Sequence, residues 1–96
     1  MYAISFEWDD AKSRRNQQTH GVSFEEAHSV FLDEDAVQFF DDFHSGEEDR
    51  YIMVGLSSHL RPLLVVHTFR EKDGVIRIIS ARKPTSAERR VYLERR

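Results

Sequence analysis

The stretch from Arg50 to Arg82 constrains the fold more than any other part of the sequence, because it contains three apolar segments of strand length divided by turn residues. The segments span residues 50–57, 63–70 and 75–82. Each is rich in valine, isoleucine, leucine and aromatic residues, which suit a pleated, half-buried surface. Asp73-Gly74 predicts a hairpin between the last two segments, since glycine adopts the positive φ of such a turn. Pro62 cannot donate to a strand ladder, so it belongs in a turn or at a strand start.

Two shorter strands and three helices are predicted around this stretch. The strands cover residues 3–8 and 36–40, and the helices run from Asp9 or Asp10 to His20, from Ser23 to residue 32 or 33, and from Ser86 to Arg95. Ser23 with Glu26, and Thr85 with Glu88, have the spacing of a capping box. Helices that come early and strands that come late predict an α+β fold, in the order β-α-α-β-β-β-β-α, with a largely antiparallel sheet.

Apolar residues at helical spacing indicate which helix faces pack on the sheet. The inward residues expected are Phe24, Ala27, Val30 and Phe31 in the second helix, and Ala87, Val91 and Leu93 or Tyr92 in the last. The first helix is unusually polar, so burial of apolar side chains alone cannot hold it in place.

Length and composition predict a single domain over residues 1–96 of the chain. Cysteine is absent, which excludes disulfides and thiolate metal sites. No apolar run approaches the roughly 20 residues that span a bilayer, and the N-terminus lacks a basic-then-apolar signal pattern, so we expect a cytoplasmic protein. The net charge of −3 hides an asymmetry: residues 33–49 carry only acidic charges, whereas arginine and lysine predominate from Arg61 onward.

Several classes of site are disfavoured by the motifs. The five histidines have no short metal-ligand spacing, so we expect no metal and no cofactor. Phosphate-binding glycine loops and a Gly-x-Ser-x-Gly nucleophile elbow are also missing.

Arginines at the margins of the predicted sheet point instead to phosphate chemistry. Arg61, Arg70 and Arg82 carry planar guanidinium groups that bind phosphate and stabilise charge developing on it. Metal-free RNA cleavage needs such cations together with an acid and a base, and His67 is a candidate for either role. Candidate side chains for stacking on a base are Tyr51, Tyr92 and Phe69.

Each of these residues also has a structural interpretation. The sequence favours a hydrogen-bonded core position for His67. Arg70 and Arg82 are equally compatible with ion pairs to the acidic segment. Arginines 89, 90, 95 and 96 are typical of a solvated helix face. The hairpin register stays open: a two-residue turn would place His67 opposite Ser80, and a four-residue loop would change that pairing.

The combined pattern resembles the BrnT-type toxins of bacterial type II toxin–antitoxin systems, over nearly the whole chain. The matching segments include Phe6-Glu7-Trp8-Asp9, His20-Gly21-Val22-Ser23-Phe24-Glu25-Glu26-Ala27, Gly46-Glu47-Glu48 with Arg50, Arg61 with Leu63, Thr68 with Arg70, Ile76-Arg77-Ile78-Ile79-Ser80-Ala81-Arg82, and Glu88-Arg89 with Tyr92. Two positions depart from the family pattern. Thr19 replaces a common lysine before His20, and Leu60 replaces a common glycine before Arg61.

The resemblance implies a RelE-like fold and a ribonuclease that blocks translation. It also implies neutralisation by a BrnA-type antitoxin that carries a ribbon-helix-helix domain, in a hetero-oligomer that reaches operator DNA only through the antitoxin. Our leading interpretation is therefore a metal-independent endoribonuclease; the alternative is a non-catalytic protein- or nucleic-acid-binding module. The candidate catalytic residues are Arg70, Arg82, His67, His20 and Glu47, and the candidate RNA-binding residues are Arg61, Arg50, Lys83 and Tyr92.

Overall fold

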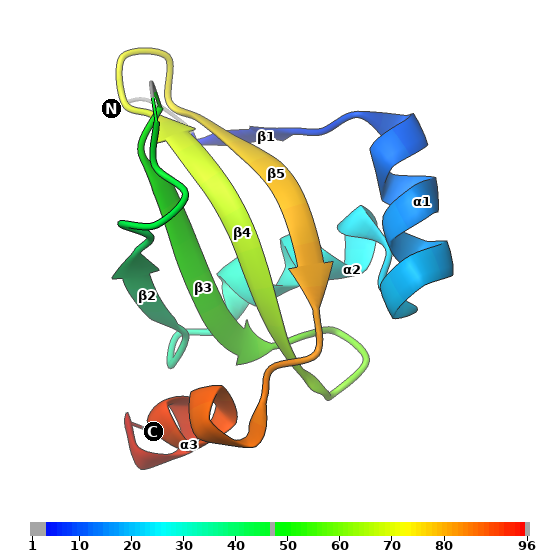
Figure 1. Ribbon diagram of the computed structural model, residues 1–96, viewed down its shortest axis with the longest axis vertical. Helices are drawn as coiled ribbons and strands as arrows, with labels where there is room; N and C mark the ends of the chain where they lie inside the picture. Colours follow the sequence, from blue (N-terminus) through cyan, green and yellow to red (C-terminus); the bar gives the residue numbers. More distant parts are fainter. Residues whose placement is uncertain (1–3, 47, 96) are drawn as a thin grey trace.

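A five-stranded sheet with the strand order β1-β5-β4-β3-β2 forms the centre of the computed structural model, which describes residues 4–46 and 48–95 (Figure 1). Its elements are β1 (Ser5–Glu7), α1 (Asp10–His20), α2 (Phe24–Ser29), the 3-10 turn η1 (Val30–Leu32), β2 (Val37–Phe40), β3 (Arg50–Leu56), β4 (Pro62–Arg70), β5 (Val75–Arg82) and α3 (Ser86–Arg95). The first strand pairs in parallel with the last, and every other pairing is antiparallel. The predicted α+β fold and element order are confirmed.

The register between β4 and β5 is set by a four-residue loop, with Arg70 opposite Val75. This register continues to His67, which lies opposite Ile78, and the ladder then shifts by one residue at a bulge, so that Val66 lies opposite Ser80 and Leu64 opposite Arg82. Gly74 in the loop has a φ of 65°, which accounts for the glycine at this position. This register decides which side chains share a face of the sheet, because successive residues of a strand point to opposite faces.

Helices α1 and α2 cover one face of the sheet. The core on that face is built by Val22, Phe24, Ala27, Val30, Leu63, Val65, Ile78 and Ala81. On the opposite face, α3 is the only helix among the described residues, and it lies across the end where β4 begins (Figure 1). There Tyr92 packs with Val37, Val54 and Leu64.

Helix α3 makes less contact with the sheet than its sequence predicts. Tyr92 is 1% exposed, but Val91 and Leu93 are 43% and 50% exposed, and Ala87 is also exposed. The prediction that these residues face inward is wrong except for Tyr92. The helix crosses the sheet end with one large ring inserted, so its other apolar side chains stay on the surface.

The polar helix α1 is attached through hydrogen bonds. Asp9 caps it by accepting from the Lys12 amide at 3.0 Å, and Gly21 ends it in the left-handed conformation with a φ of 72°. The buried Asn16 amide donates to the carbonyls of Val22 and Ala81 at 2.8 and 2.7 Å, and its oxygen accepts from the Ala81 amide. Buried polar groups that are fully paired in this way fix the end of β5 relative to the turn after α1.

Within residues 4–46 and 48–95, no helix has the length and apolarity that crossing a membrane requires.

Candidate functional site

The predicted site residues are divided between two ends of the sheet. We call the end where residues 57–61 connect β3 to β4, and where β5 stops, the turn end; the end with the 71–74 loop is the hairpin end (Figure 1). Arg82 lies opposite Leu64 at the turn end, whereas Arg70 lies opposite Val75 at the hairpin end. The length of β5 separates them, about 20 Å at roughly 3.3 Å per residue. The structure therefore does not bring these two arginines to one phosphate.

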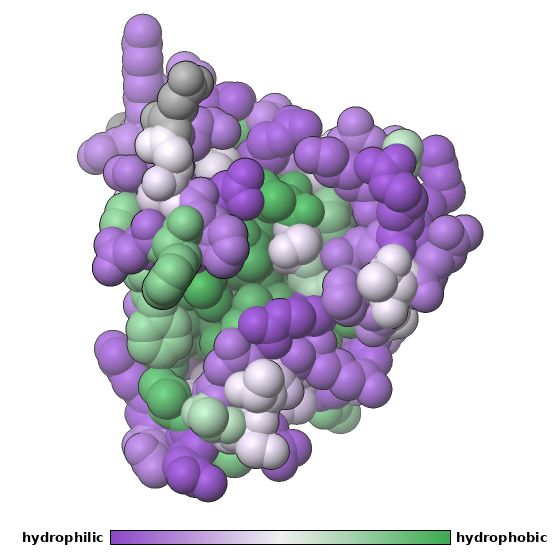
Figure 2. Space-filling model, viewed as in Figure 1, coloured by the Kyte–Doolittle hydropathy of each residue, from purple (hydrophilic) through white to green (hydrophobic). Residues whose placement is uncertain are grey.

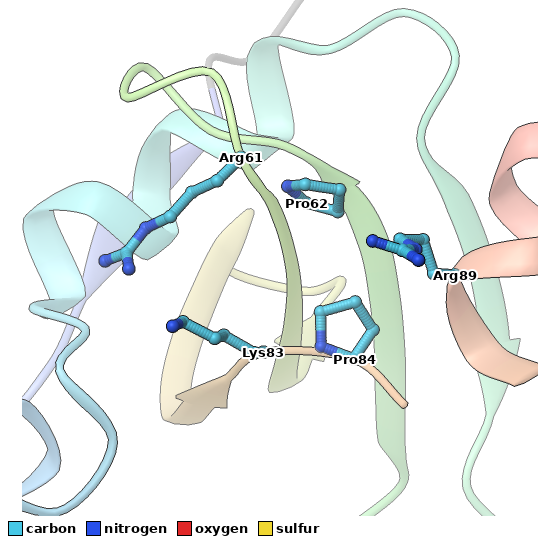
Figure 3. A pocket seen from close by; sticks show the side chains of 5 residues that line it. All are labelled: Arg61, Pro62, Lys83, Pro84 and Arg89. Atoms are coloured by element: carbon cyan, nitrogen blue, oxygen red, sulfur yellow. The ribbon is translucent and has the colours of Figure 1, made fainter. Parts of the chain in front are cut away.

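A pocket at the turn end gathers cationic side chains from three separate segments. It has a volume of about 160 Å³ and is lined by Arg61, Pro62, Lys83, Pro84 and Arg89, which we call the basic pocket. Figure 3 shows Arg61 and Lys83 reaching to the same side, while Arg89 enters from α3 beyond the two prolines. The side chains of Lys83 and Arg89 have no hydrogen-bond or ion-pair partner among the described residues. Their charge is thus available to an anion.

Arg61 is held in the basic pocket by the buried carboxylate of Glu26. Its Nε donates to Glu26 Oε2 at 2.8 Å and its Nη2 to Glu26 Oε1 at 2.7 Å, and Nη2 also donates to the Gly21 carbonyl at 2.8 Å. The hydrogen bonds from Arg61 lower the pKa of Glu26, and the same pairing raises the pKa of Arg61. Two rigid planar groups joined in this way leave Arg61 little rotational freedom.

Glu26 explains a difference from the predicted capping box. Its amide donates to Ser23 Oγ at 3.1 Å, as expected for the cap. Its carboxylate points toward the sheet instead of back to the cap, and accepts from Ser57 Oγ at 2.7 Å as well as from Arg61. A carboxylate that is 4% exposed needs such donors to offset its lost hydration. The spacing Ser-x-x-Glu predicted the cap but not this second role.

The turn that presents Arg61 is fixed by several hydrogen bonds. The Ser57 amide donates to the Arg61 carbonyl and the Leu60 amide to the Ser57 carbonyl, both at 2.9 Å, and the Ser58 amide donates to Ser29 Oγ at 2.8 Å. Leu60 has a φ of 60°, the left-handed conformation that glycine adopts without strain. His59 projects from this turn and places Nδ1 3.2 Å from Glu26 Oε1.

Arg82 lies beside the basic pocket but is already paired. Its Nη1 and Nη2 donate to the two carboxylate oxygens of Glu88 at 2.8 and 3.0 Å. Glu88 also completes the predicted capping box with Thr85 in both directions. The hydrogen bonds from Arg82 lower the pKa of Glu88 to about 2. Strand β5 and helix α3 are therefore joined next to the pocket by a bidentate ion pair.

The arginines at the hairpin end are largely neutralised. Arg70 lies 3.1 Å from Glu7 and 3.5 Å from Asp73, and Arg77 lies 3.4 Å from the same Glu7 oxygen. Arg77 was not predicted as a site residue, although its alternation with Ile76 and Ile78 indicates a different sheet face. Arg50 begins β3 on this face, opposite Thr68.

His67 and Tyr92, both predicted at the site, are buried. His67 is 1% exposed, with Nε2 3.1 Å from Gln38 Oε1 and Nδ1 3.3 Å from the Val65 carbonyl, and burial lowers its pKa to about 4. It faces α1 and α2, away from the arginines. Tyr92 donates its hydroxyl to Asp33 at 2.6 Å and presents no ring face for stacking on a base. The core interpretation of His67 agrees with the structure.

The two remaining predicted residues are not part of the basic pocket. His20 ends α1 and lines a separate shallow pocket with Lys12, Arg15 and Thr19. Glu47 lies outside the described residues, so its predicted role stays a prediction.

An apolar groove runs between α3 and the β2–β3 side of the same face. It is lined by Phe39, Ile52, Val54, Leu64, Glu88 and Val91. Figure 2 shows apolar surface over this part of the sheet, bordered by hydrophilic side chains. No group of three or more histidine, aspartate and glutamate side chains in the described ranges is arranged to hold a metal ion.

Comparison with known proteins relates this geometry to one family. Residues 8–88 match the family model described as the ribonuclease toxin BrnT of type II toxin–antitoxin systems. The fold is similar to the 1.1 Å crystal structure of the Brucella abortus ribonuclease toxin BrnT, with a TM-score of 0.65 and 19% sequence identity over 88% of this chain and 100% of that one. A search of curated proteins finds no match.

Proposed function

The chain belongs to the BrnT family of ribonuclease toxins of type II toxin–antitoxin systems, and we propose that it cleaves RNA at the turn end of its sheet without a metal ion. The observation that carries this assignment is that Arg61, Lys83 and Arg89 all line one pocket. Of these three cations, only Arg61 is paired within the described residues. Unpaired cations gathered in a hollow attract a phosphodiester and stabilise the additional charge of its transition state.

The arginines along the sheet extend the same surface. Arg82 adjoins the basic pocket, and an RNA phosphate would compete with Glu88 for its two parallel donors. Arg50 and Arg70 lie on this face at the hairpin end. We assign them a weaker role in guiding the RNA strand, because Glu7 and Asp73 already balance the charge of Arg70.

Chelation tests the metal independence of cleavage. The purified protein is incubated with a long unstructured RNA that contains all sixteen dinucleotide steps, and in parallel with ribosomes translating a messenger RNA, each with and without EDTA. We expect equal cleavage with and without EDTA in whichever format is active. Loss of cleavage in EDTA that one divalent metal restores would overturn this part of the proposal. A protein that binds RNA but never cuts it would favour a binding module instead.

We propose a BrnA-type antitoxin with a ribbon-helix-helix domain as the partner, and a hetero-oligomer as the resting state in the cytoplasm. The apolar groove beside α3 supports this proposal, because it adjoins the basic pocket and exposes Phe39 and Val91. Arg89 and Arg90 on α3 favour an antitoxin segment that combines apolar side chains with carboxylates. One segment bound there would cover the cations and exclude RNA.

Competition tests this mode of neutralisation. RNA binding is measured for the free protein and for its complex with the cognate antitoxin, and Val91→Asp is compared with the solvent-facing Glu94→Ala. We expect the complex to bind no RNA and only Val91→Asp to weaken the complex. If the complex bound and cut RNA as well as the free protein does, steric neutralisation would be wrong.

A further inference from the structure

The cations of the basic pocket do not by themselves complete the chemistry of RNA cleavage. The attacking 2′-hydroxyl must lose a proton, and guanidinium and ammonium groups carry no lone pair that can accept it at neutral pH. His67, the first histidine candidate from the sequence, is 1% exposed on the other face of the sheet. A base has to come from a different residue near the pocket.

His59 is the candidate for that base, because it is exposed and contacts the same carboxylate as Arg61. Its side chain is 66% exposed, and it shares the turn of residues 57–61 with Arg61. Both side chains contact one oxygen: Glu26 Oε1 lies 3.2 Å from His59 Nδ1 and 2.7 Å from Arg61 Nη2. The imidazole is thereby held against a residue that lines the basic pocket.

The carboxylate of Glu26 also favours one of the two ring tautomers of His59. Nδ1 is the ring nitrogen that lies 3.2 Å from Glu26 Oε1. The negative charge beside it favours the tautomer with the proton on Nδ1 and the lone pair on Nε2. Nε2 has no partner in the part of the chain that the structure describes, and most of the side chain meets solvent. A buried carboxylate beside an exposed imidazole favours the state in which histidine can take a proton from a hydroxyl.

A second histidine–carboxylate pair provides an internal comparison. His44 Nδ1 lies 3.0 Å from Asp41 Oδ2, and the His44 side chain is 69% exposed. This pair lies in the segment 33–49, whose charged residues are all acidic. An RNA phosphate is repelled there, whereas the turn end supplies Lys83 and Arg89 beside Arg61. The remaining histidines lack such a pairing, since His20 has no partner among the described residues and His28 packs against Phe6.

We propose that His59 is the general base of the ribonuclease reaction, with Glu26 as its positioning residue; this inference rests on the proposed cleavage of RNA at the turn end. Nε2 of His59 accepts the proton of the 2′-hydroxyl while O2′ forms a bond to phosphorus. The bond from phosphorus to O5′ breaks, and O5′ takes a proton from water. The products are a 2′,3′-cyclic phosphate and a 5′-hydroxyl, and His59 then returns its proton to solvent.

The decisive variant is His59→Asn, with His44→Asn as the matched control. The asparagine amide nitrogen can take the position of Nδ1 beside Glu26, but nothing replaces Nε2. We expect kcat to fall by about 10²–10³-fold with KM changed less than threefold, as loss of a general base implies. His44→Asn should stay within twofold of the natural protein. Both are assayed on the RNA and ribosome substrates described above.

The pH dependence of cleavage separates a base from a structural residue. The charged groups that face the imidazole are Glu26 from α2 and Arg61 from its own turn. A general base must be a neutral imidazole, so kcat of the natural protein should decrease toward acid pH. This decrease should be absent from the residual activity of His59→Asn. Added imidazole should restore part of the activity of His59→Ala but not of Lys83→Ala.

Each outcome has one meaning. Unchanged kcat in His59→Asn, or an acid limb that survives in it, would overturn the role of His59 while leaving the ribonuclease proposal intact. If the natural protein cuts neither RNA substrate, the proposed function itself fails. Circular dichroism and thermal unfolding of His59→Asn confirm that the comparison concerns a folded protein.

Discussion

The two ends of β4 carry the same types of residue in opposite physical states. At the turn end, the His59 imidazole is 66% exposed, and Arg61 shares a carboxylate with it. The side chains of Lys83 and Arg89 beside them have no partner in the described part of the chain. At the hairpin end, His67 is 1% exposed, and Arg70 faces Glu7 and Asp73. A histidine close to an arginine in sequence is thus exposed to solvent at one end of the strand and buried at the other, which is why we propose the site at the turn end.

The comparison is tested most strongly by removing cations from each end. Lys83→Ala and Arg89→Ala should each weaken RNA binding by about tenfold, and each lost phosphate contact should reduce the salt slope by about 0.7. Arg70→Ala should change affinity less than threefold, because Glu7 already neutralises that charge. Fluorescence anisotropy over a range of salt concentrations measures both quantities. Equal losses of RNA affinity at the two ends would mean that ion pairing within the protein does not decide which arginines and lysines bind RNA.

The state of His67 is tested by its effect on stability. Its pKa falls from 6.5 to about 4 on burial, so the unfolded chain binds more protons at pH 5. The stabilisation by neutral His67 is complete above pH 6.5 and decreases as pH falls toward 4, by about 2 kcal/mol at pH 5. His67→Phe should lose this part of the pH dependence in urea unfolding at pH 7 and pH 5. His59→Asn should keep this pH dependence of stability. If His59→Asn lost it and His67→Phe kept it, His59 and not His67 would be the buried, neutral histidine.

The ion pair between Arg82 and Glu88 predicts that Arg82 stabilises the fold, whereas Lys83 and Arg89 bind RNA. Arg82→Lys loses the bidentate geometry, and we expect about 1 kcal/mol lower stability at pH 7, since a third of the Glu88 side chain is exposed. The lowered pKa of Glu88 means that this contribution is present above pH 4.5 and disappears as pH falls toward 2. Glu88→Gln should give a similar loss of thermal midpoint at pH 7. If Arg82→Lys leaves the midpoint unchanged but abolishes cleavage, Arg82 acts on RNA directly.

The smallest expected effect comes from the turn that carries His59. Leu60 has a φ of 60°, which costs a leucine about 1–2 kcal/mol and glycine nearly nothing. Leu60→Gly removes this cost, but the greater conformational freedom of glycine in the unfolded chain offsets part of the benefit. We therefore expect Leu60→Gly to raise the free energy of unfolding by about 0.5 kcal/mol. Leu60→Ala keeps the strain and should not stabilise. Equal midpoints for the two variants in chemical unfolding would show that the turn is not strained.

Local signals in the sequence accounted for most of the fold. The bounds of β5 and α3 agree with the prediction, and α1 begins after Asp9 and ends before Gly21 as expected. Strand and helix periodicity, helix caps and turn residues act over a few positions, so they are legible without knowledge of the tertiary structure. The arginine-rich character of the strand ends and the family resemblance were also available from the sequence alone.

Only the tertiary structure decided which of these residues form a site. Glu26 and Arg61 are 35 positions apart, and the contact between them depends on how α2 packs against the turn end. His67 points to the core face by alternation with Leu63 and Val65, but its burial depends on Phe31 and Gln38, which are distant in the sequence. Arg89, which had the pattern of a solvated helix residue, lines the basic pocket because α3 crosses the end of the sheet. Burial and ion pairing determine the charge and reach of a side chain, and both depend on neighbours that are distant in the sequence.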